Sequence, residues 1–197
     1  MKVWAYLNSN GVLCCALNPN AVPQGVSAIE LDVNSPDDVI LNNGTITVKT
    51  QAQLFAEAQQ KAIKDLSQKT TAYILKHYPE WKQRADVSNL TNGETYLASQ
   101  GIDITALRKA IGSALLNGTA FSTALSNLNQ TYNTNSNATI SYWLGQVLKA
   151  SYRQYFVYQV KQEYYTYLQK IQQATSLPLP SFEFKTPFPN LTTGQQT

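Results

Sequence analysis

Residues 140–174 read ISYWLGQVLKASYRQYFVYQVKQEYYTYLQKIQQA, and this stretch decides the fold class of the C-terminal half of the chain. It contains no proline and a single glycine, Gly145, so nothing in it forces a helix to end. As a helix it spans about 50 Å at ~1.5 Å per residue, whereas a globular domain of this chain length is only ~35–40 Å across. Its apolar residues recur at helical spacing, through Ile140, Trp143, Leu144, Val147, Leu148, Val157, Val160, Tyr164, Tyr167 and Ile171.

Seven of the 12 tyrosines fall in this stretch and surround the helix instead of lining one side. Tyrosine combines apolar area with a polar group, so rings on several faces indicate contacts with several neighbours. A central helix in a monomeric bundle is the alternative explanation, because long helices also occur in monomers. The seven residues are Tyr142, Tyr152, Tyr155, Tyr158, Tyr164, Tyr165 and Tyr167.

The C-terminal arm, residues 177–197, follows the long helix and cannot be helical, because four prolines alternate with three phenylalanines. Prolines pre-order an extended chain, so docking the arm costs less conformational entropy. Three phenylalanines on a free tail would expose apolar surface, and we therefore expect the arm to lie against its own domain or a neighbouring subunit. The residues concerned are Pro178, Pro180, Pro187, Pro189, Phe182, Phe184 and Phe188.

A second helix is predicted upstream, from residue 51 to the octet KHYPEWKQ at residues 76–83. Thr50 is a suitable N-cap, and no glycine or proline interrupts the pattern before Pro79. The apolar stripe is thin and rich in alanine, which suits packing against one neighbouring helix. Pro79 is predicted to end the helix, because it lacks an N–H and disfavours the helical region for Tyr78.

Shorter helices are predicted between the octet and the long helix. A polar passage, DVSNLTNGE at residues 86–94, comes first. Asp103 is then expected to cap a helix over ITALRKAIGSALL, which stops before Gly118. A further short helix is predicted over residues 119–128. Residues 127–139 are low in apolar side chains, and we expect an exposed loop there.

Residues 1–50 are predicted to form β structure. The runs KVWAYL, VLCCAL, SAIELDV and TITVKT give four short strands. The pairs Asn10-Gly11 and Asn43-Gly44 mark turns, and an Asn-Gly pair between two strands indicates a hairpin, since both central positions tolerate positive φ. Asp37 and Asp38 follow Pro36 and are interpreted as turn residues rather than as a pair of catalytic carboxylates. So small a sheet buries little surface alone and must lean on a partner or on the rest of the chain.

Together these patterns predict an α+β chain with four segments. A small N-terminal antiparallel β module at residues 1–50 is followed by a mainly α-helical region at residues 51–138. One long helix at residues 139–176 comes next, and the extended Pro/Phe-rich C-terminal arm at residues 177–197 completes the chain.

Charge and cysteine content exclude several classes of protein. The net charge is +3 and no Lys/Arg cluster exceeds two residues, so the basic stripe of a nucleic-acid-binding protein is missing. No signal peptide opens the sequence and no apolar run approaches 18 residues, so we expect neither export nor membrane insertion. The only cysteines, Cys14 and Cys15, are interpreted as two buried thiols of a protein made in a reducing cytoplasm.

An amide-rich composition leaves a binding role open. The 34 Asn and Gln residues outnumber the 27 charged residues, which is typical of assemblies and also of glycan-binding chains. Trp4, Tyr6, Trp81 and the tyrosine-rich helix can supply rings for stacking on sugars or single-stranded nucleic acid. Aromatic residues at helical spacing are more often packing residues, and packing is the interpretation that we favour.

The sequence predicts no enzyme. The single histidine, His77, excludes a multi-histidine metal site and is expected to be a helix C-terminal partner. No phosphate-binding glycine loop, dinucleotide-binding motif or nucleophile elbow is present. The acidic residues of the helical part are scattered, with no close pair that would indicate glycoside hydrolysis. No cofactor and no metal is predicted.

The organisation resembles small tail-associated proteins of bacteriophages, of the tail fibre, baseplate or tail fibre assembly type. In these, a β module with the pattern P-x-G-V…I-E-L-D, an acidic turn and N-G precedes a helical segment with Y-I-L…Y-P-x-W-K-Q. The stretch DITALRKAIGSALL is similar to the short helix that follows. The resemblance covers roughly residues 2–116 and leaves residues 117–197 without a counterpart. The matching residues are Pro23, Gly25, Val26, Ile29, Glu30, Leu31, Asp32, Asn43, Gly44, Tyr73, Ile74, Leu75, Tyr78, Pro79, Trp81, Lys82 and Gln83.

The resemblance implies structural work without a catalytic residue. We expect a homo-oligomeric component of a bacteriophage virion, in the tail fibre or baseplate region, made in the host cytoplasm and bound to other virion proteins. The β module would attach to a neighbour, while the long helix and the arm bury surface between copies. A dissociable tail fibre assembly chaperone and a host-glycan-binding adhesin are the alternatives. The candidate structural or interface residues are Tyr78, Pro79, Trp81, Trp143, Tyr155, Tyr158, Tyr164, Tyr167, Phe182, Phe184 and Phe188.

The octet KHYPEWKQ receives a structural hypothesis of its own. Pro79 ends the helix so that Tyr78 and Trp81 wedge between it and the next element, with Lys82 and Gln83 on the surface. On this hypothesis, replacing Trp81 by alanine destabilises the fold by ~3–5 kcal/mol.

Overall fold

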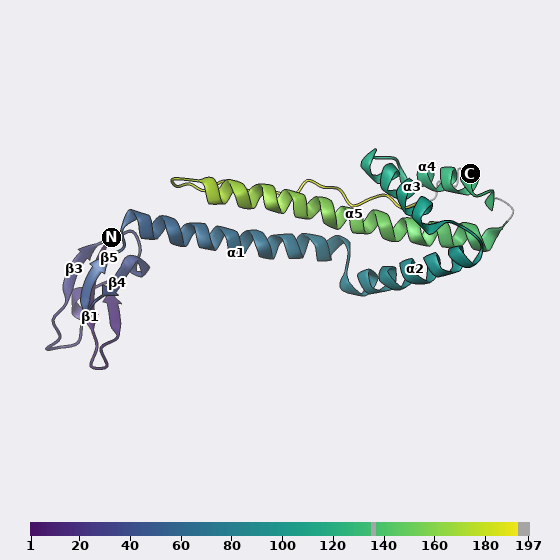
Figure 1. Cartoon of the computed structure of the whole chain (residues 1–197). Coiled ribbons are helices and arrows are strands. Elements are labelled where there is room, and N and C mark those ends of the chain that lie inside the picture. Colours follow the sequence, from purple (N-terminus) through teal and green to yellow (C-terminus); the bar gives the residue numbers. More distant parts are fainter. Residues whose placement is uncertain (135–136, 193–197) are drawn as a thin grey trace. The chain divides into compact units, whose positions relative to one another are not determined.

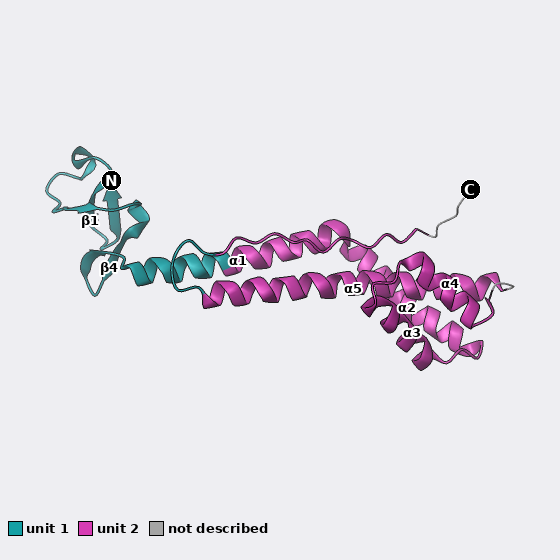
Figure 2. Cartoon of the chain, turned by 90° about the horizontal axis from the view of Figure 1, so that it is seen from above, with its two compact units in different colours: residues 1–62, 174–179 teal, residues 63–173, 180–197 magenta. Residues whose placement is uncertain are grey.

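A computed structural model describes residues 1–134 and 137–192, and Figure 1 shows its strands and helices. The chain divides into two compact units, residues 1–62 with 174–179, and residues 63–173 with the chain from residue 180 onward (Figure 2). The division at Ala62 falls inside helix α1, Gln51–His77, so this helix contributes to both units. The predicted fold class is confirmed: small antiparallel sheets come first, five α-helices of the described residues follow, and the last of them is the longest.

The first unit contains two small antiparallel sheets. β1 (Lys2–Leu7) is the central strand of one sheet and pairs with β2 (Leu13–Ala16) and β3 (Ile29–Asp32) on its two sides. β4 (Val39–Asn42) and β5 (Thr45–Val48) form a hairpin. The sequence-based number of four strands is therefore wrong by one. The missed strand, β4, has the sequence VILN and lies directly between the residues of two turns, so it shows almost no alternation of apolar and polar side chains.

The hairpin turn and the core of this unit follow the sequence pattern. Asn43 and Gly44 both have positive φ, 48° and 79°, as a hairpin turn of this kind requires, whereas at Asn10-Gly11 only the glycine does, at 73°. Val3, Ala5, Val33 and Val39 form the buried core, with alternate residues of β1 pointing into it. The cysteines of β2 are free thiols, but both are half-buried, so the expectation of two buried thiols is wrong in degree.

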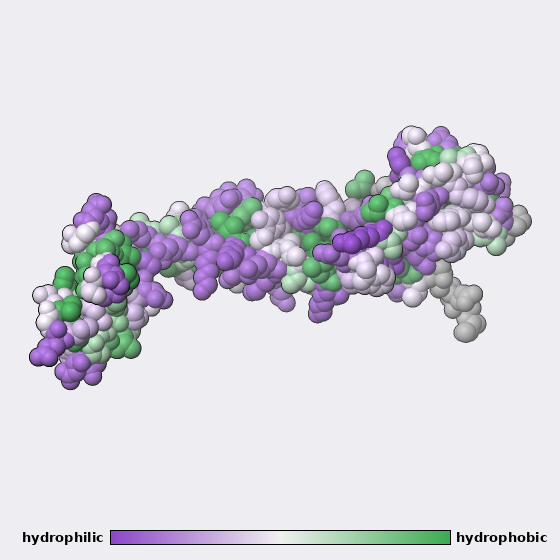
Figure 3. All heavy atoms as spheres, turned by 90° about the horizontal axis from the view of Figure 1, so that it is seen from below, coloured by the Kyte–Doolittle hydropathy of each residue, from purple (hydrophilic) through white to green (hydrophobic). Residues whose placement is uncertain are grey.

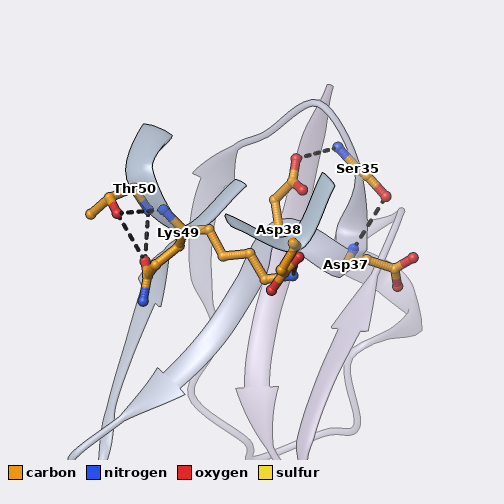
Figure 4. Close-up of polar contacts among 7 residues, drawn as sticks. Ser35, Asp37, Asp38, Lys49 and Thr50 are labelled. Atoms are coloured by element: carbon orange, nitrogen blue, oxygen red, sulfur yellow. Dashed lines mark hydrogen bonds and ion pairs between the residues drawn. The ribbon is translucent and has the colours of Figure 1, made fainter. Parts of the chain in front are cut away.

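The passage from the sheets into α1 is held by side-chain caps (Figure 4). Asp37 and Asp38 lie in a short 3-10 helix, Pro36–Asp38, where Ser35 and Asp38 cap each other's backbone N–H, as the turn interpretation predicted. The backbone N–H of Lys49 donates to the Asp38 carbonyl at 2.8 Å. Thr50 is the N-cap that the sequence predicted: its hydroxyl accepts from the N–H of Gln53, whose side chain accepts from the N–H of Thr50.

The second unit is helical. The C-terminal part of α1 is followed by α2 (Glu80–Ser99), α3 (Ile104–Leu116), α4 (Phe121–Thr131) and α5 (Ala138–Gln173). α5 is the predicted long helix, with its ends within three residues of the expected ones. Asp103 caps α3 as predicted, because its carboxylate accepts from two backbone N–H groups at the start of the helix.

One sequence-based expectation about the connections is wrong, and one passage that carried no secondary-structure prediction is helical. The polar passage at residues 86–94 lies inside α2, which continues through it. Its polar side chains are tolerated because most of them face solvent, while Asp86 has buried partners. The exposed loop expected at residues 127–139 is shorter, because α4 continues to Thr131 and α5 begins at Ala138. Residues 135–136 of that loop lie outside the described residues.

A close approach between α2 and α5 organises the helical core. Leu97, Leu107, Phe121, Leu144 and Leu148 are all at most 2% exposed there, and they come from α2, α3, α4 and α5. At Gly93 the two helices leave no room for a side chain: an added Cβ would lie 2.7 Å from Cγ2 of Val147 and 3.1 Å from Cε3 of Trp143. The glycine in the polar passage of α2 is thus a packing residue.

Candidate interaction site on helices α1 and α5

The octet KHYPEWKQ forms the corner between α1 and α2. The N–H of Tyr78 still donates to the Ile74 carbonyl of α1, at 2.7 Å, and Pro79 is the N-cap residue of α2. The predicted end of the helix at Pro79 is confirmed, with α2 beginning at the next residue. Lys82 and Gln83 are half-buried rather than on the surface, and the Gln83 amide donates to the Tyr78 carbonyl at 2.7 Å.

Tyr78 belongs to a buried polar network that joins the corner between α1 and α2 to α5. Its hydroxyl donates to Oδ2 of Asp86 at 2.9 Å. Nη1 of Arg153 donates to both carboxylate oxygens of Asp86, at 2.8 Å and 2.9 Å. The side chains of Asp86 and Arg153 are only 4% and 13% exposed. Burial, followed by the hydrogen bond to Asp86, raises the pKa of Tyr78 well above its ordinary value, so the phenol stays neutral in the folded chain.

The wedge hypothesis is correct for Tyr78 and wrong for Trp81. Tyr78 is 2% exposed, whereas the Trp81 side chain is 70% exposed on the first turn of α2. Two residues three apart on either side of a proline corner point in different directions, because the corner reorients the backbone between them. The fold therefore gives Trp81 no packing role.

Next to Tyr78 lies the surface that carries the C-terminal arm. We call Tyr73, His77, Phe156, Glu163 and Tyr167 the arm-binding surface; the first two come from α1 and the other three from α5. Its floor is Phe156 with Val160, which are 1% and 0% exposed. The arm lies beside these helices in both Figure 1 and Figure 2.

Two phenylalanines of the arm pack on the aromatic part of this surface. The ring of Phe184 stacks on Tyr73 with centroids 5.3 Å apart. The ring of Phe188 meets Phe156 edge-on at 5.1 Å and stacks on His77 at 6.0 Å. His77 is the last residue of α1, as expected, but it serves as an aromatic contact there. Offset and edge-on pairs of this kind add to the apolar burial.

Polar side chains hold the arm's backbone. The Glu163 carboxylate accepts from the N–H groups of Lys185 and Thr186, at 2.9 Å and 2.8 Å, and also from the Thr186 hydroxyl. The Tyr73 hydroxyl donates to the Thr186 carbonyl at 2.8 Å, and the Tyr167 hydroxyl donates to the Glu183 carbonyl at 2.7 Å. Charge-assisted bonds to a carboxylate are among the stronger protein hydrogen bonds. Residues 183–186 are thus bound mainly through their main chain.

The arm runs antiparallel to α5 in an extended conformation. Its residues 183, 186 and 188 contact residues 167, 163 and 156 of α5 in turn. Residues 156–167 of a helix cover about 16 Å at ~1.5 Å per residue, and residues 183–188 cover about 16 Å at ~3.1 Å per residue when extended. The two lengths match, so the arm can contact α5 along the whole of this segment.

The end of the surface near Phe182 is less completely filled. Phe182 packs on Tyr167 with centroids 6.0 Å apart, and Nζ of Lys69 lies 4.8 Å from the Phe182 centroid. A hollow of ≈ 420 Å³ remains between α1 and the arm; its lining consists of Lys69, Ala72, Tyr73, Lys76, Phe182, Glu183 and Phe184.

The other candidate residues of α5 lie elsewhere. Trp143 is half-buried and packs on the helical core, with Tyr96 at 6.1 Å between centroids. Tyr155 and Tyr158 stack at 5.8 Å and line a hollow of ≈ 350 Å³ between α2, α3 and α5, where Tyr158 is exposed. Tyr164 is half-buried and pairs with its neighbour Tyr165.

The rings proposed for stacking on sugars or nucleic acid belong to different units of the chain. Trp4 and Tyr6 are half-buried in β1 of the first unit, and Trp81 lies in α2 of the second. Within residues 1–134 and 137–192, no three His, Cys, Asp or Glu side chains gather where they could hold a metal ion. No helix of the described chain is long and apolar enough to cross a bilayer.

Sequence reasoning missed the residues that anchor the arm and the corner. Glu163 stood out only as one scattered acid among many, and Asp86 as part of a polar passage. One indication was available: Phe156, Val160, Glu163 and Tyr167 recur at three- and four-residue intervals, which places them on one face of α5. Nothing in the sequence paired that face with the arm.

Comparisons of the chain with protein-family models, with curated proteins and with solved structures found no significant match.

Proposed function

We propose that this chain is a structural component of a bacteriophage virion, in the tail fibre or baseplate region, and that it acts by oligomerisation and by attachment to neighbouring virion proteins. The proposal takes the place in the virion from the resemblance of residues 2–116 to phage tail-associated proteins. No catalytic role is part of it.

The observation that carries the proposal is the exposure of Trp81. The octet that bears the resemblance also bears three aromatic rings, and two of them, His77 and Tyr78, have packing roles in the fold. Trp81 has none and is 70% exposed. Tryptophan is among the residues that most often dominate binding energy when a partner buries them. An exposed indole at the centre of the motif therefore supports attachment to another protein.

The β module supplies a second apolar surface. Figure 3 shows hydrophobic residues gathered at the surface of the first unit. Ile29, Leu41 and Val48 are 48%, 40% and 37% exposed on three of its strands. β2 and β3 are edge strands, each paired with β1 alone among the described strands. Exposed apolar residues beside free strand edges are typical of surfaces that add a strand from a partner.

A dissociable tail fibre assembly chaperone is the second candidate, and one observation favours it. The phenylalanines of the arm already pack on the arm-binding surface of the same chain, so a single copy covers them without a partner. A chaperone must be stable alone before and after it meets its client. A virion component has no such requirement.

The test is to locate the chain in particles from a host culture that produces them. Antibodies against the chain are applied to purified particles, by immunoblot and by immunogold electron microscopy. Labelling of the tail supports the virion component. Chain found in the infected-cell lysate in complex with a tail protein, but missing from the particles, supports the chaperone. Chain found in neither place contradicts both. Trp81→Ala is the matched variant, and it should lower the amount incorporated without lowering the amount of folded chain.

A further inference from the structure

We propose that the C-terminal arm is exchanged between copies of this chain: the arm of one copy binds the arm-binding surface of a second copy. The inference rests on the proposed function, because exchange of the arm is a way to link copies of a self-assembling component. It assigns the arm-binding surface a ligand of stated chemistry, an extended segment with the sequence FEFKTPF, residues 182–188.

The first step is that the arm can leave its place without disturbing any helix or strand. Its bonds are made by side chains of α1 and α5 to residues 183–186, and its rings pack on the same surface. Residues 174–181, which connect α5 to the arm, lie outside every helix and strand, and most of their side chains are exposed. Fully extended, eight residues reach about 26 Å at ~3.3 Å each. This segment is therefore suited to act as a hinge.

The second step is that the contacts are specific for this segment. Three polar side chains bind the main chain of this segment at residues 183, 185 and 186, while Tyr73, His77 and Phe156 receive the rings of Phe184 and Phe188. A second copy presents the same segment to the same surface. Exchange of an identical element keeps every contact and is a low-cost route to oligomers. The prolines keep the arm extended while it is free, which lowers the entropy cost of binding.

The third step is that the surface must be occupied. Without the arm, Phe156 and Val160, which are buried to 99% or more, would lose the cover of Phe184 and Phe188. The hollow of ≈ 420 Å³ lies at the Phe182 end, so the contacts nearest to the hinge are the least complete. When the arm opens from this end, it exposes the arm-binding surface of its own copy. The arm of a second copy can then bind to that surface.

The experiment maps the arm by cross-linking in a Cys14→Ser/Cys15→Ser background. One tagged chain carries Gln159→Cys on α5, and a differently tagged chain carries Lys185→Cys on the arm; both positions have exposed side chains. The two chains are co-expressed, purified through both tags and treated with a flexible bis-maleimide. Exchange predicts a covalent dimer that contains one chain of each kind. Adding Glu163→Ala should lower its yield about tenfold, because charge-assisted bonds to the arm are lost.

The controls distinguish the outcomes. Placing both cysteines on one chain reports an arm bound to its own copy. A product of monomer mass from this chain, with no mixed dimer from the pair, overturns the exchange, and so does the absence of any cross-link. A mixed dimer whose yield ignores Glu163→Ala also overturns it, because that product is not made at the arm-binding surface. The result stays separate from the proposed function: particle labelling can fail while exchange occurs, and a virion component can assemble without exchanging its arm.

Discussion

Arg153 and Asp86 are 67 residues apart in the sequence, and Nη1 of Arg153 lies 2.8 Å and 2.9 Å from the two carboxylate oxygens of Asp86. The pair fixes the corner at Tyr78, because the same carboxylate accepts from the Tyr78 hydroxyl. Nε of Arg153 is buried with no hydrogen-bond partner in the described chain. Each of these two buried charges is tolerated in the fold only because the other one compensates it.

Asp86→Ala is predicted to lower the free energy of unfolding by about 3–5 kcal/mol, because it leaves the Arg153 guanidinium buried and unpaired. Chemical denaturation followed by circular dichroism measures the change. The matched control is Glu94→Ala, which removes the partner of Arg108, a side chain that is 67% exposed. That variant should cost less than about 1 kcal/mol, because the remaining charge is solvated. Equal losses in the two variants would contradict the role assigned to burial.

The raised pKa of Tyr78 predicts that the contribution of this side chain to folding stability falls at alkaline pH. The unfolded phenol ionises near pH 10, while the folded one stays protonated above that value because it is buried and bonded to Asp86. Its contribution to stability is full below about pH 10 and is lost as the pH rises further. Tyr78→Phe should therefore be less stable than the natural chain by about 1 kcal/mol at neutral pH. This difference in the free energy of unfolding between the two chains should narrow between about pH 10 and 11. A gap that stays constant or widens over that window would count against the assignment.

Trp81→Ala is predicted to change the free energy of unfolding by less than about 1 kcal/mol. The sequence-based hypothesis predicted a larger loss of stability. The Trp81 side chain is 70% exposed, however, so its removal leaves no cavity. Phe156→Ala is the comparison, since Phe156 is 1% exposed and should cost about 3–5 kcal/mol. Denaturation of both variants in one buffer decides the matter. A loss of more than ~3 kcal/mol in the free energy of unfolding of Trp81→Ala would support the wedge hypothesis for this residue.

Gly93→Ala and Gly112→Ala should move stability in opposite directions. Both glycines are helical, and alanine favours a helix by about 1 kcal/mol over glycine. At Gly112 an added Cβ meets nothing within 4 Å, so the variant should gain about 0.5–1 kcal/mol. At Gly93 the Cβ would lie 2.7 Å from Cγ2 of the buried Val147, and overpacking costs about 1–3 kcal/mol. Thermal unfolding of the two variants gives the signs; a stabilised Gly93→Ala would mean that α2 and α5 separate easily.

The predictable part of the fold lies where local chemistry decides. Caps and turns act on neighbouring backbone groups, so their effects can be predicted from a few adjacent residues. Examples are Thr50, Asp103, Pro79 and Asn43-Gly44. α2 is different. Its polar passage at residues 86–94 carried no secondary-structure prediction, and the two buried residues of this passage, Asp86 and Gly93, contact α5. Tertiary context outweighed local preference there.

The arm shows the same division. Its extended form and its need for cover follow from Pro187, Phe184 and Phe188, whose side chains restrict the chain or require burial. The identity of the covering surface does not follow, because it depends on pairing residue 163 with residues 185 and 186. Such non-local pairings leave no trace in the spacing of a single sequence. The exposure of Trp81 was not predicted for a different reason: the direction of its side chain depends on how the chain turns at Pro79.

The hold of Glu163 on the arm predicts a change in proteolysis. Lys185 has an exposed side chain and its backbone N–H is bound by the Glu163 carboxylate, so trypsin can cut after it only when the arm opens. Glu163→Ala removes two main-chain bonds to a charged acceptor, each worth about 1.5–3 kcal/mol. The cleavage rate at Lys185 should rise at least about tenfold. Glu183→Ala is the control, because the arm uses the carbonyl of that residue and not its exposed carboxylate. Mass spectrometry of timed digests reads both rates, and a similar acceleration in the two variants would show that charge alone, rather than the bonds of Glu163, protects the arm.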